Sequence, residues 1–387
     1  MQKQKNPILW KRGALWLAFF GPFFFLSYGW LNQFTSTRTD VGVAVAAWEA
    51  AIPFVPWMML PYMSIDAFYA GSLFLFRKRH ALDRHALRLL LATTISLIGF
   101  LLFPLQFSFA VPKIDGFNGF LQTILLGFDK PYNQAPSLHI SLLIVLWVVY
   151  AKRLQGFWRL ALHTWLFAIG ASVLLVYQHH FIDVWTGALA GVACLYFIPD
   201  RPFYWRKKLP NHRMILMAWR YVMGAVVALM AGLYLKQLSS FFTLLFSWVA
   251  IALALVAAAY FGFEKQVFQR HQGVMRWPAR LMLAPYLLGS WLSYRVYTRN
   301  NRHPVEIKNG VWLGAFPDKN MFQTRWLAVL DLTNEFTTTP FKNVAHHKFL
   351  PVMDLTPPAP IVLVRAVRWM TFVGKQANLQ DDAHAIL

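Results

Sequence analysis

Eight apolar stretches of about twenty residues constrain the fold of this chain more than any other feature. They occupy residues 14–34, 52–76, 89–110, 137–151, 158–178, 183–199, 217–235 and 241–262. A helix needs about 20 mostly apolar residues to cross a bilayer, so each stretch is a candidate span. The stretch 137–151 is short, so its helix is expected to begin earlier or to thin the bilayer locally. With 57% hydrophobic and 14% charged residues, the composition argues against a soluble domain and predicts an all-α polytopic membrane protein.

The basic residues predict how the spans are oriented. The chain has a formal net charge of +21, and Lys and Arg concentrate in KQKNPILWKR near the start and in segments 77–88, 151–159 and 200–214. These segments fall in alternate loops, which the positive-inside rule places in the cytoplasm. The loops at 35–51, 111–136 and 236–240 carry few positive charges. We expect membrane lipids as partners and no nucleic acid, because the basic residues form no single polar module.

The single cysteine, Cys194, excludes an intramolecular disulfide and a cysteine-rich metal site. It lies in the apolar run GALAGVACLYF, where a small core residue is the ordinary interpretation. The first apolar run has no small-residue cleavage site, so we expect it to remain as a span rather than to be removed as a signal peptide.

The character of the sequence changes after residue 262. Residues 263–303 mix basic and apolar side chains and include Pro278 and Pro285, which predicts an amphipathic segment at the membrane surface. From residue 304 we expect a small α/β domain. Its short buried strands are predicted at VWLGAF, WLAVLDL and KFLPVMDL, and its amphipathic helix at VLVRAVRWMTFVGKQA.

Two histidines stand where candidate spans begin and end. His139 lies in PSLH at the start of one span, and His179 lies in VYQHHFIDVWTG at the end of the next. Their separation corresponds to about two spans of twenty residues, so the chain crosses the membrane, returns, and brings both to the same, non-cytoplasmic face. Asp183 follows His179 by four residues, which on a helix places the carboxylate beside the imidazole.

These residue types suit phosphoryl transfer. A histidine oriented by an aspartate is a primed nucleophile or base, and a second histidine across the site serves as a general acid. The helix that opens at Pro136 and Ser137 offers free backbone N–H groups and a positive dipole end to a phosphate.

The motifs PSLH and SVLLVYQHHFID resemble the second and third signature motifs of the type 2 phosphatidic acid phosphatase superfamily, in the branch shared with inositol-phosphorylceramide synthases. The resemblance covers about residues 50–200. It implies a six-helix phosphatase core, to which two further spans are added. It also implies that His179 is the nucleophile, that Asp183 orients it, and that His139 protonates the leaving oxygen, with no metal and no cofactor.

The sequence departs from this family at its cationic positions. Val173 stands where the third motif usually carries an arginine, and Val111 and Pro112 stand in the place of the Arg-Pro of the first motif. We therefore expect Lys113 and Lys130 to supply the missing phosphate-binding charge. With Ser137, these two lysines are the predicted substrate-binding residues.

A second resemblance begins at Gly310. GVWLGAFPD, LAVLDLTNEF and FLPVMDLTPPAP look like the first half of a dual-specificity protein phosphatase domain, as found fused to this membrane core in some bacterial inner-membrane proteins. Asp354 matches the place of that family's general acid. That chemistry also needs a Cys-x5-Arg loop with a thiolate nucleophile. The chain has no such loop, so this small, incomplete α/β C-terminal domain is expected to be inert or truncated.

The predicted organisation has five segments. They are an N-terminal span and outer loop (1–50), a lipid-phosphatase-like catalytic core (51–200), two additional transmembrane helices (201–262), an amphipathic linker (263–303) and the partial phosphatase-like domain (304–387).

Three functions are compatible with these residues. The first is a lipid phosphatase of the bacterial inner membrane, which hydrolyses a lipid phosphate monoester or diphosphate at the periplasmic face. The second is a phosphotransferase with a lipid or sugar hydroxyl as acceptor, and the third is a non-catalytic membrane scaffold. Asp66, an acid inside the second candidate span, is either functional or a helix-packing group. His180 is expected to pack or to face the headgroups rather than to react.

Overall fold

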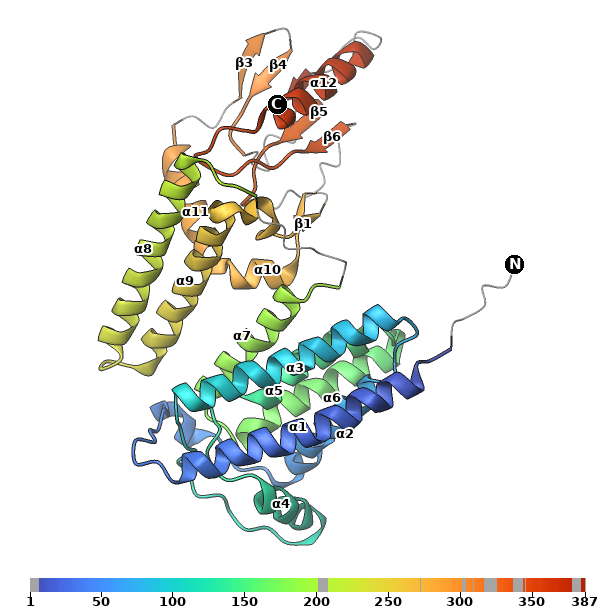
Figure 1. The fold of residues 1–387 in the computed structure, drawn as a ribbon, viewed down its shortest axis with the longest axis vertical. Coiled ribbons are helices and arrows are strands. Elements are labelled where there is room, and N and C mark those ends of the chain that lie inside the picture. Colours follow the sequence, from blue (N-terminus) through green and yellow to red (C-terminus); the bar gives the residue numbers. More distant parts are fainter. Residues whose placement is uncertain are drawn as a thin grey trace. The chain divides into compact units, whose positions relative to one another are not determined.

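The computed structural model describes residues 7–200, 208–271, 273–300, 304–308, 310–316, 326–336, 344, 346–377 and 384–386. The chain divides into two compact units, Met1–Phe203 and Tyr204–Leu387 (Figure 1). Each unit is described by itself below. The two predicted histidines belong to the first unit.

The first unit is a helical bundle. Its elements are α1 (Trp10–Ser36), η1 (Ala47–Ala51), η2 (Pro56–Met58), α2 (Met59–Ser72), α3 (Arg79–Leu102), α4 (Gly116–Phe128), α5 (Leu138–Ala151), α6 (Gly156–Leu175) and α7 (Phe181–Phe197). Helix α5 is central, because it packs against α2, α3, α6 and α7, while α1 packs along α3 (Figure 1).

Five segments of the described chain are long and apolar enough to cross a membrane. They are α1, α3, α6, Phe241–Gln266 and the helix His212–Leu235. Helices α5 and α7 are apolar but shorter, and α2 has only 14 residues. The predicted helical, multi-pass character is thus confirmed in part, with five candidate spans by length rather than eight.

Helix α3 corrects the prediction that residues 77–88 form a loop, since the helix already begins at Arg79. The polar residues of this segment have partners within the bundle. Arg12 of α1 donates to Asp83 at 2.6 Å, and the buried Arg88 pairs with Asp200 at 2.7 Å. Helix α3 therefore includes a charged segment before its apolar run, and charged side chains of that segment pair with other parts of the bundle.

Helix α4 also lies where a loop, 111–136, is predicted. Its exposed large side chains, Phe117, Phe120 and Ile124, follow helical spacing, while Gln122 and Leu125 are buried. The helix is too short to span a bilayer, but its apolar exposed face suits the membrane surface.

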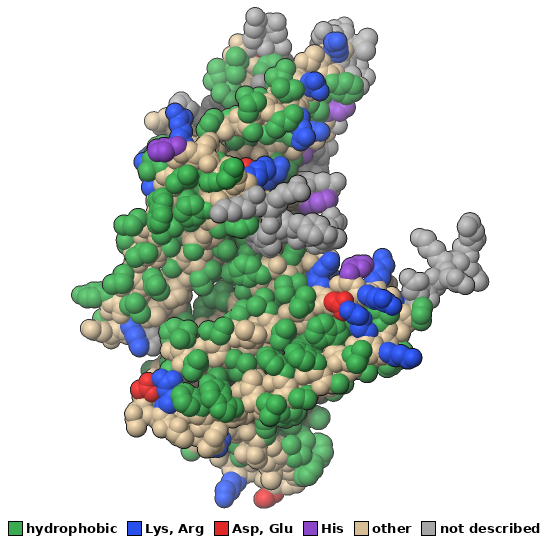
Figure 2. Space-filling view, viewed as in Figure 1, with side chains coloured by type: hydrophobic (Ala, Val, Ile, Leu, Met, Phe, Trp, Pro, Cys, Tyr) green, Lys and Arg blue, Asp and Glu red, His purple; other side chains and the backbone are tan. Residues whose placement is uncertain are grey.

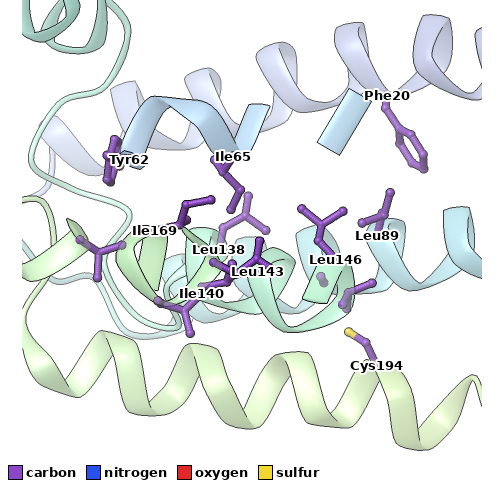
Figure 3. Packing of buried hydrophobic residues seen from close by; sticks show 14 of the residues in the cluster. Phe20, Tyr62, Ile65, Leu89, Leu138, Ile140, Leu143, Leu146, Ile169 and Cys194 are labelled. Atoms are coloured by element: carbon purple, nitrogen blue, oxygen red, sulfur yellow. The ribbon is translucent and has the colours of Figure 1, made fainter. Parts of the chain in front are cut away.

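The core of the bundle surrounds α5 (Figure 3). Its buried apolar residues come from all the long helices and include Phe20, Tyr62, Ile65, Leu89, Leu138, Ile140, Leu143, Leu146, Ile169 and Cys194. Two glycines allow α7 to approach α5 closely. A Cβ on Gly187 would lie 2.5 Å from the carbonyl oxygen of Ser137, and one on Gly191 would lie 2.9 Å from that of Ser141. This close approach fixes the start of α5 against the start of α7.

Hydrophobic side chains cover most of the visible helical surface of this unit, and Lys and Arg gather toward one end (Figure 2). Arg12, Arg79 and Arg153 belong to the end where α1 and α3 begin and α5 finishes. His139, in the first turn of α5, therefore lies at the opposite end from these cations.

The second unit begins with a helical hairpin, α8 (His212–Leu235) and α9 (Ser240–Ala258). A π-helical turn, η3 (Ala259–Phe263), and η4 (Glu264–Gln266) follow. The predicted amphipathic linker then contains the hairpin β1 (Arg270–His271) and β2 (Val274–Met275) and the helices α10 (Trp277–Met282) and α11 (Ala284–Tyr297). Among the described residues of this linker, the longest element is α11, with 14 residues.

The C-terminal part of this unit contains a five-stranded sheet of order β3-β4-β7-β5-β6, with α12 (Pro360–Ala377) packed on β5. Its strands are β3 (Val305–Lys308), β4 (Val311–Leu313), β5 (Trp326–Asp331), β6 (His346–Phe349) and β7 (His384–Ile386). The predicted α/β pattern is present, but the third predicted strand begins and ends earlier, at His346 and Phe349. Strands β3 and β7 are not among those predicted. Strand β7 lies between β4 and β5 and pairs with both in parallel.

A buried ion pair ties the linker hairpin to this sheet. Arg270 of β1 lies 3.1 Å from the carboxylate of Asp331 at the end of β5, and both side chains are almost fully buried. The guanidinium also stacks on Phe349 of β6, 4.1 Å from the ring centroid. The linker and the α/β part are therefore packed together.

Candidate active site

His139 and His179 meet because of where three helices begin and end. Helix α5 begins at Leu138, α6 ends at Leu175 and α7 begins at Phe181. Since α5 and α6 are antiparallel neighbours, the start of the first lies beside the end of the second. Both histidines line one cavity of about 420 Å³. The structure thus brings together the two residues whose spacing predicts a shared site.

His179 lies next to Asp183, as predicted, but not on the same helix. Nδ1 of His179 is 3.5 Å from Oδ2 of Asp183. Helix α7 begins only at Phe181, because Asp183 caps it by accepting a hydrogen bond from the backbone N–H of His180 at 2.8 Å. The predicted proximity of His179 and Asp183 is thus present, but the predicted reason for it, one helical turn shared by both residues, is wrong. A capping interaction places them together instead.

His139 occupies the first turn of α5. Its ring stacks on Tyr62 of α2, with the centroids 4.3 Å apart, and its Nε2 is buried without a hydrogen-bond partner among the described residues. An unpaired buried nitrogen is unusual in a folded protein. A group bound in the cavity would supply the missing partner.

Ser137 has a structural role in the unliganded chain. Its side chain caps α5 by accepting from the N–H of Ile140, and its own N–H donates to the carbonyl of Asp183 at 3.1 Å. The hydroxyl is fully buried and does not line the cavity. Ser137 therefore positions His139 relative to Asp183.

Lys113 and Lys130 do not reach the cavity. Lys113 is exposed, and Lys130 donates to Gln33 and Ser36 near the end of α1. Neither lysine belongs to the cavity wall. The structure thus separates both predicted phosphate-binding cations from the two histidines.

Both ring nitrogens of His180 have hydrogen-bond partners away from the cavity. Its Nδ1 lies 3.0 Å from Oε2 of Glu49, and its Nε2 lies 3.0 Å from the hydroxyl of Ser108. Phe107 stacks on the ring. Since both ring nitrogens have partners and the side chain is buried, His180 is placed to hold together the segments that contain Glu49 and Ser108, in line with the packing role expected for it.

Replacing His180 by alanine is expected to lower stability. The change removes one partner of the buried Glu49 carboxylate, which costs about 1–3 kcal/mol. The thermal unfolding midpoint of the purified chain in detergent measures this loss. His179→Ala is the matched control and should leave the midpoint near the wild-type value, so equal midpoints for the two variants would contradict the assignment.

The structure adds Asp129, which the sequence reasoning misses. It follows α4 directly, lines the cavity, and accepts hydrogen bonds from the hydroxyl of Tyr28 at 3.1 Å and the amide of Asn32 at 3.0 Å. Burial raises the pKa of Asp129 to about 6, while the neighbouring His179 and the Tyr28 hydrogen bond act in the opposite direction. No sequence motif marks this residue, because its partners lie about a hundred positions earlier, on α1.

The raised pKa of Asp129 predicts a pH-dependent stability. Its unfolded value is about 3.9, so the folded chain binds the proton more tightly, and stability should increase as pH falls from about 6 to about 4. At about 1.4 kcal/mol per pKa unit, the gain is on the order of 3 kcal/mol at most. Unfolding midpoints measured across this range test it. Asp129→Asn should remove this increase, and an identical pH profile in that variant would contradict it.

The rest of the cavity wall is mainly apolar. It is formed by α1, α2, α4 and α5, with residues that include Leu17, Phe20, Phe24, Phe25, Met63, Ile65, Ile124, Leu125, Phe128 and Leu142. Asp66 of α2, the acid in the second predicted span, also lines it. Among the described residues, no Lys or Arg belongs to this wall, and no group of three or more His, Cys, Asp or Glu is placed to bind a metal ion.

Asp354 of the second unit lies in an exposed turn after β6, and its carbonyl accepts a hydrogen bond from the hydroxyl of Tyr260 at 2.8 Å. Its predicted general-acid role stays a prediction. Comparison of the chain with protein-family models, curated proteins and solved structures finds no match.

Proposed function

We propose that this chain is a membrane-embedded lipid phosphatase that acts through a phosphohistidine on His179. The observation that carries the proposal is the convergence of His179 and His139 on one cavity whose remaining wall is mainly apolar, with Asp183 lying 3.5 Å from His179. An imidazole next to a carboxylate suits nucleophilic attack, and a second imidazole suits proton transfer. An apolar cavity suits the hydrocarbon part of a lipid.

The first step forms a bond between Nε2 of His179 and phosphorus, while the bond from phosphorus to the lipid oxygen breaks. Asp183 accepts a hydrogen bond from Nδ1–H, which stays on the ring, and so stabilises the positive charge that develops there. The separation of 3.5 Å is longer than a hydrogen bond, but such contacts commonly shorten when substrate binds. His139 gives its proton to the departing lipid oxygen, which leaves as an alcohol.

The second step returns the enzyme to its starting state. Water attacks phosphorus, His139 takes a proton from that water, and the bond between phosphorus and His179 breaks. The products are the lipid alcohol and inorganic phosphate. His139 is thus protonated and deprotonated once in each cycle.

The proposal includes the family and the topology. We infer a type 2 phosphatidic acid phosphatase core made of α1, α2, α3, α5, α6 and α7, with α8 and α9 as two additional spans. The basic segments lie at the end of the bundle opposite His139, which supports an active site on the non-cytoplasmic side. For a bacterial inner membrane, that side is the periplasm.

Phosphate release tests the proposal. The purified chain in lipid nanodiscs is incubated with phosphatidic acid, lysophosphatidic acid or an isoprenyl diphosphate, and inorganic phosphate is measured. We expect release from at least one of them and none from the same preparation of His179→Ala. Equal release by the two proteins would contradict the proposal. A His179-dependent phosphoenzyme without release would indicate a hydroxyl acceptor instead of water.

A further inference from the structure

The cavity wall has carboxylates but no described lysine or arginine to balance them, and its other polar groups are hydroxyls, one amide and two imidazole rings. The wall carries the carboxylates of Asp66 and Asp129 and the side chain of Asn133, and no described Lys or Arg. A phosphate group alone would add negative charge to this wall, and like charges in a poorly solvated site repel. The wall therefore calls for a positive charge from the ligand.

Asn133 is an independent sign of a missing hydrogen-bond donor. Its side chain is 2% exposed, and its amide nitrogen donates to the carbonyl of Tyr28 at 3.1 Å. The amide orientation leaves Oδ1 buried without a partner among the described residues. Since a buried polar atom is normally paired, an N–H donor in the cavity would satisfy it.

Asp66 is a second acceptor on the cavity wall, and its side chain is exposed rather than enclosed by protein partners. It belongs to α2, lines the cavity, and makes no hydrogen bond or ion pair within the described residues. An acid within a membrane segment normally pairs with another group or faces a functional cavity. Asp129 differs, because Tyr28 and Asn32 already hold its carboxylate in place.

Aromatic rings complete this surface. Tyr28, Tyr62 and Tyr69 line the cavity together with Phe24 and Phe128. The rings of Tyr28, Phe24 and Phe128 contact one another, with centroid distances of 5.0 Å for Tyr28–Phe24 and 5.9 Å for both Tyr28–Phe128 and Phe24–Phe128. Aromatic faces combined with carboxylates are the usual surroundings of a bound ammonium group.

We propose that the lipid phosphate cleaved at this site carries an ammonium group close to its phosphorus. The ammonium binds Asp66, Asp129 and Asn133 Oδ1, and the phosphorus lies at His179. This inference deepens the proposed function and rests on it. The amine can belong to the lipid backbone, as in a sphingoid phosphate, or to a headgroup, as in an ethanolamine phosphodiester. In the second case diacylglycerol leaves first, and water then releases ethanolamine phosphate from His179 in place of inorganic phosphate.

Matched lipid pairs test the proposal and distinguish the two sources. One pair is sphingosine 1-phosphate and its N-acetyl derivative, followed by phosphate release. The other is phosphatidylethanolamine and its N-acetyl derivative, followed by diacylglycerol release. In at least one pair, we expect kcat/KM for the lipid with the free amine to be about tenfold or more higher than for its N-acetyl derivative. Turnover that depends on His179 but is equal or faster with both N-acetyl lipids would overturn the proposal.

Variants connect this preference to the two carboxylates. Asp66→Asn and Asp129→Asn should each reduce the preference for the amine, and the double variant should bring the ratio close to one. Asp115→Asn is the matched control, because Asp115 precedes α4 but does not line the cavity. A ratio that stays high in the double variant would contradict the assignment.

A binding measurement separates this inference from the proposed chemistry. Sphingosine has the amine but no phosphate, and N-acetylsphingosine lacks the charge. Sphingosine should raise the thermal midpoint of the wild-type chain more than N-acetylsphingosine does, and the double variant should lose the difference. Equal shifts of the wild-type midpoint by sphingosine and N-acetylsphingosine would overturn the proposed ammonium site. Absence of His179-dependent turnover with all four lipids would contradict only the phosphatase proposal.

Discussion

His179→Ala should reduce lipid phosphate turnover at least about a thousandfold, because it removes the atom that forms the covalent intermediate. The ring of His179 lines the cavity, and its buried Nδ1 has no hydrogen-bond partner among the described residues, so the fold loses little when the ring is removed. Initial rates of phosphate release, measured at saturating substrate, give the effect on kcat. The thermal midpoint, measured in the same preparation, should stay close to that of the wild type.

Two neighbouring variants sharpen this result. Asp183→Asn should slow turnover less than His179→Ala does, since it changes the group that orients the nucleophile and leaves the nucleophile present. His180→Ala should act chiefly on stability, through Glu49. Turnover that survives in His179→Ala but disappears in His180→Ala would show that the adjacent histidine is the nucleophile.

Gly21→Phe should block the apolar part of the cavity. Gly21 lies on α1 and lines the cavity, and a Cβ built on it meets no atom within 4 Å. A phenyl ring at this position occupies space that we assign to the lipid chain. Displacing about four methylene groups, at about 0.8 kcal/mol each, would cost about 3 kcal/mol, or roughly a hundredfold in kcat/KM.

Two controls isolate the filling effect. Pro22 follows Gly21, and a residue with a Cβ before proline is strained in a helix, so Gly21→Ala carries that strain without filling the cavity. Gly29→Phe adds the same ring to the same helix at another open position outside the cavity wall. Equal loss in all three variants, or full activity in Gly21→Phe, would contradict the assignment of the cavity to the lipid chain.

The helical part of the fold follows well from the sequence, because apolar runs of span length are a strong local signal. The limits of the elements are less predictable where charged residues find partners far away in the chain. Arg88 is buried within α3 and pairs with Asp200, which follows it by more than a hundred residues, so the local sequence does not reveal this partner. Strand β7 is short and borders two other strands, so its pattern is too brief to mark it.

In the candidate site, too, some residues are marked by the local sequence and others only by contacts with distant parts of the chain. His139 and His179 are predictable from their spacing and from the helix ends they occupy, and the structure places both on one cavity. Asp129 and Glu49 are single acids in connecting segments, and their partners, Asn32 and His180, lie far from them in the sequence. A search for acids between spans would have included both, but only tertiary contacts distinguish them from the other loop acids.

The most direct test of the central claim is to map the phosphorylated residue. The wild-type chain is quenched during turnover under alkaline conditions, which preserve phosphohistidine, and its peptides are sequenced by mass spectrometry. The account predicts one phosphoryl group on His179, absent in His179→Ala and lost on acid treatment. A phosphoryl group on any other residue, or steady turnover with none detectable on His179, would contradict it.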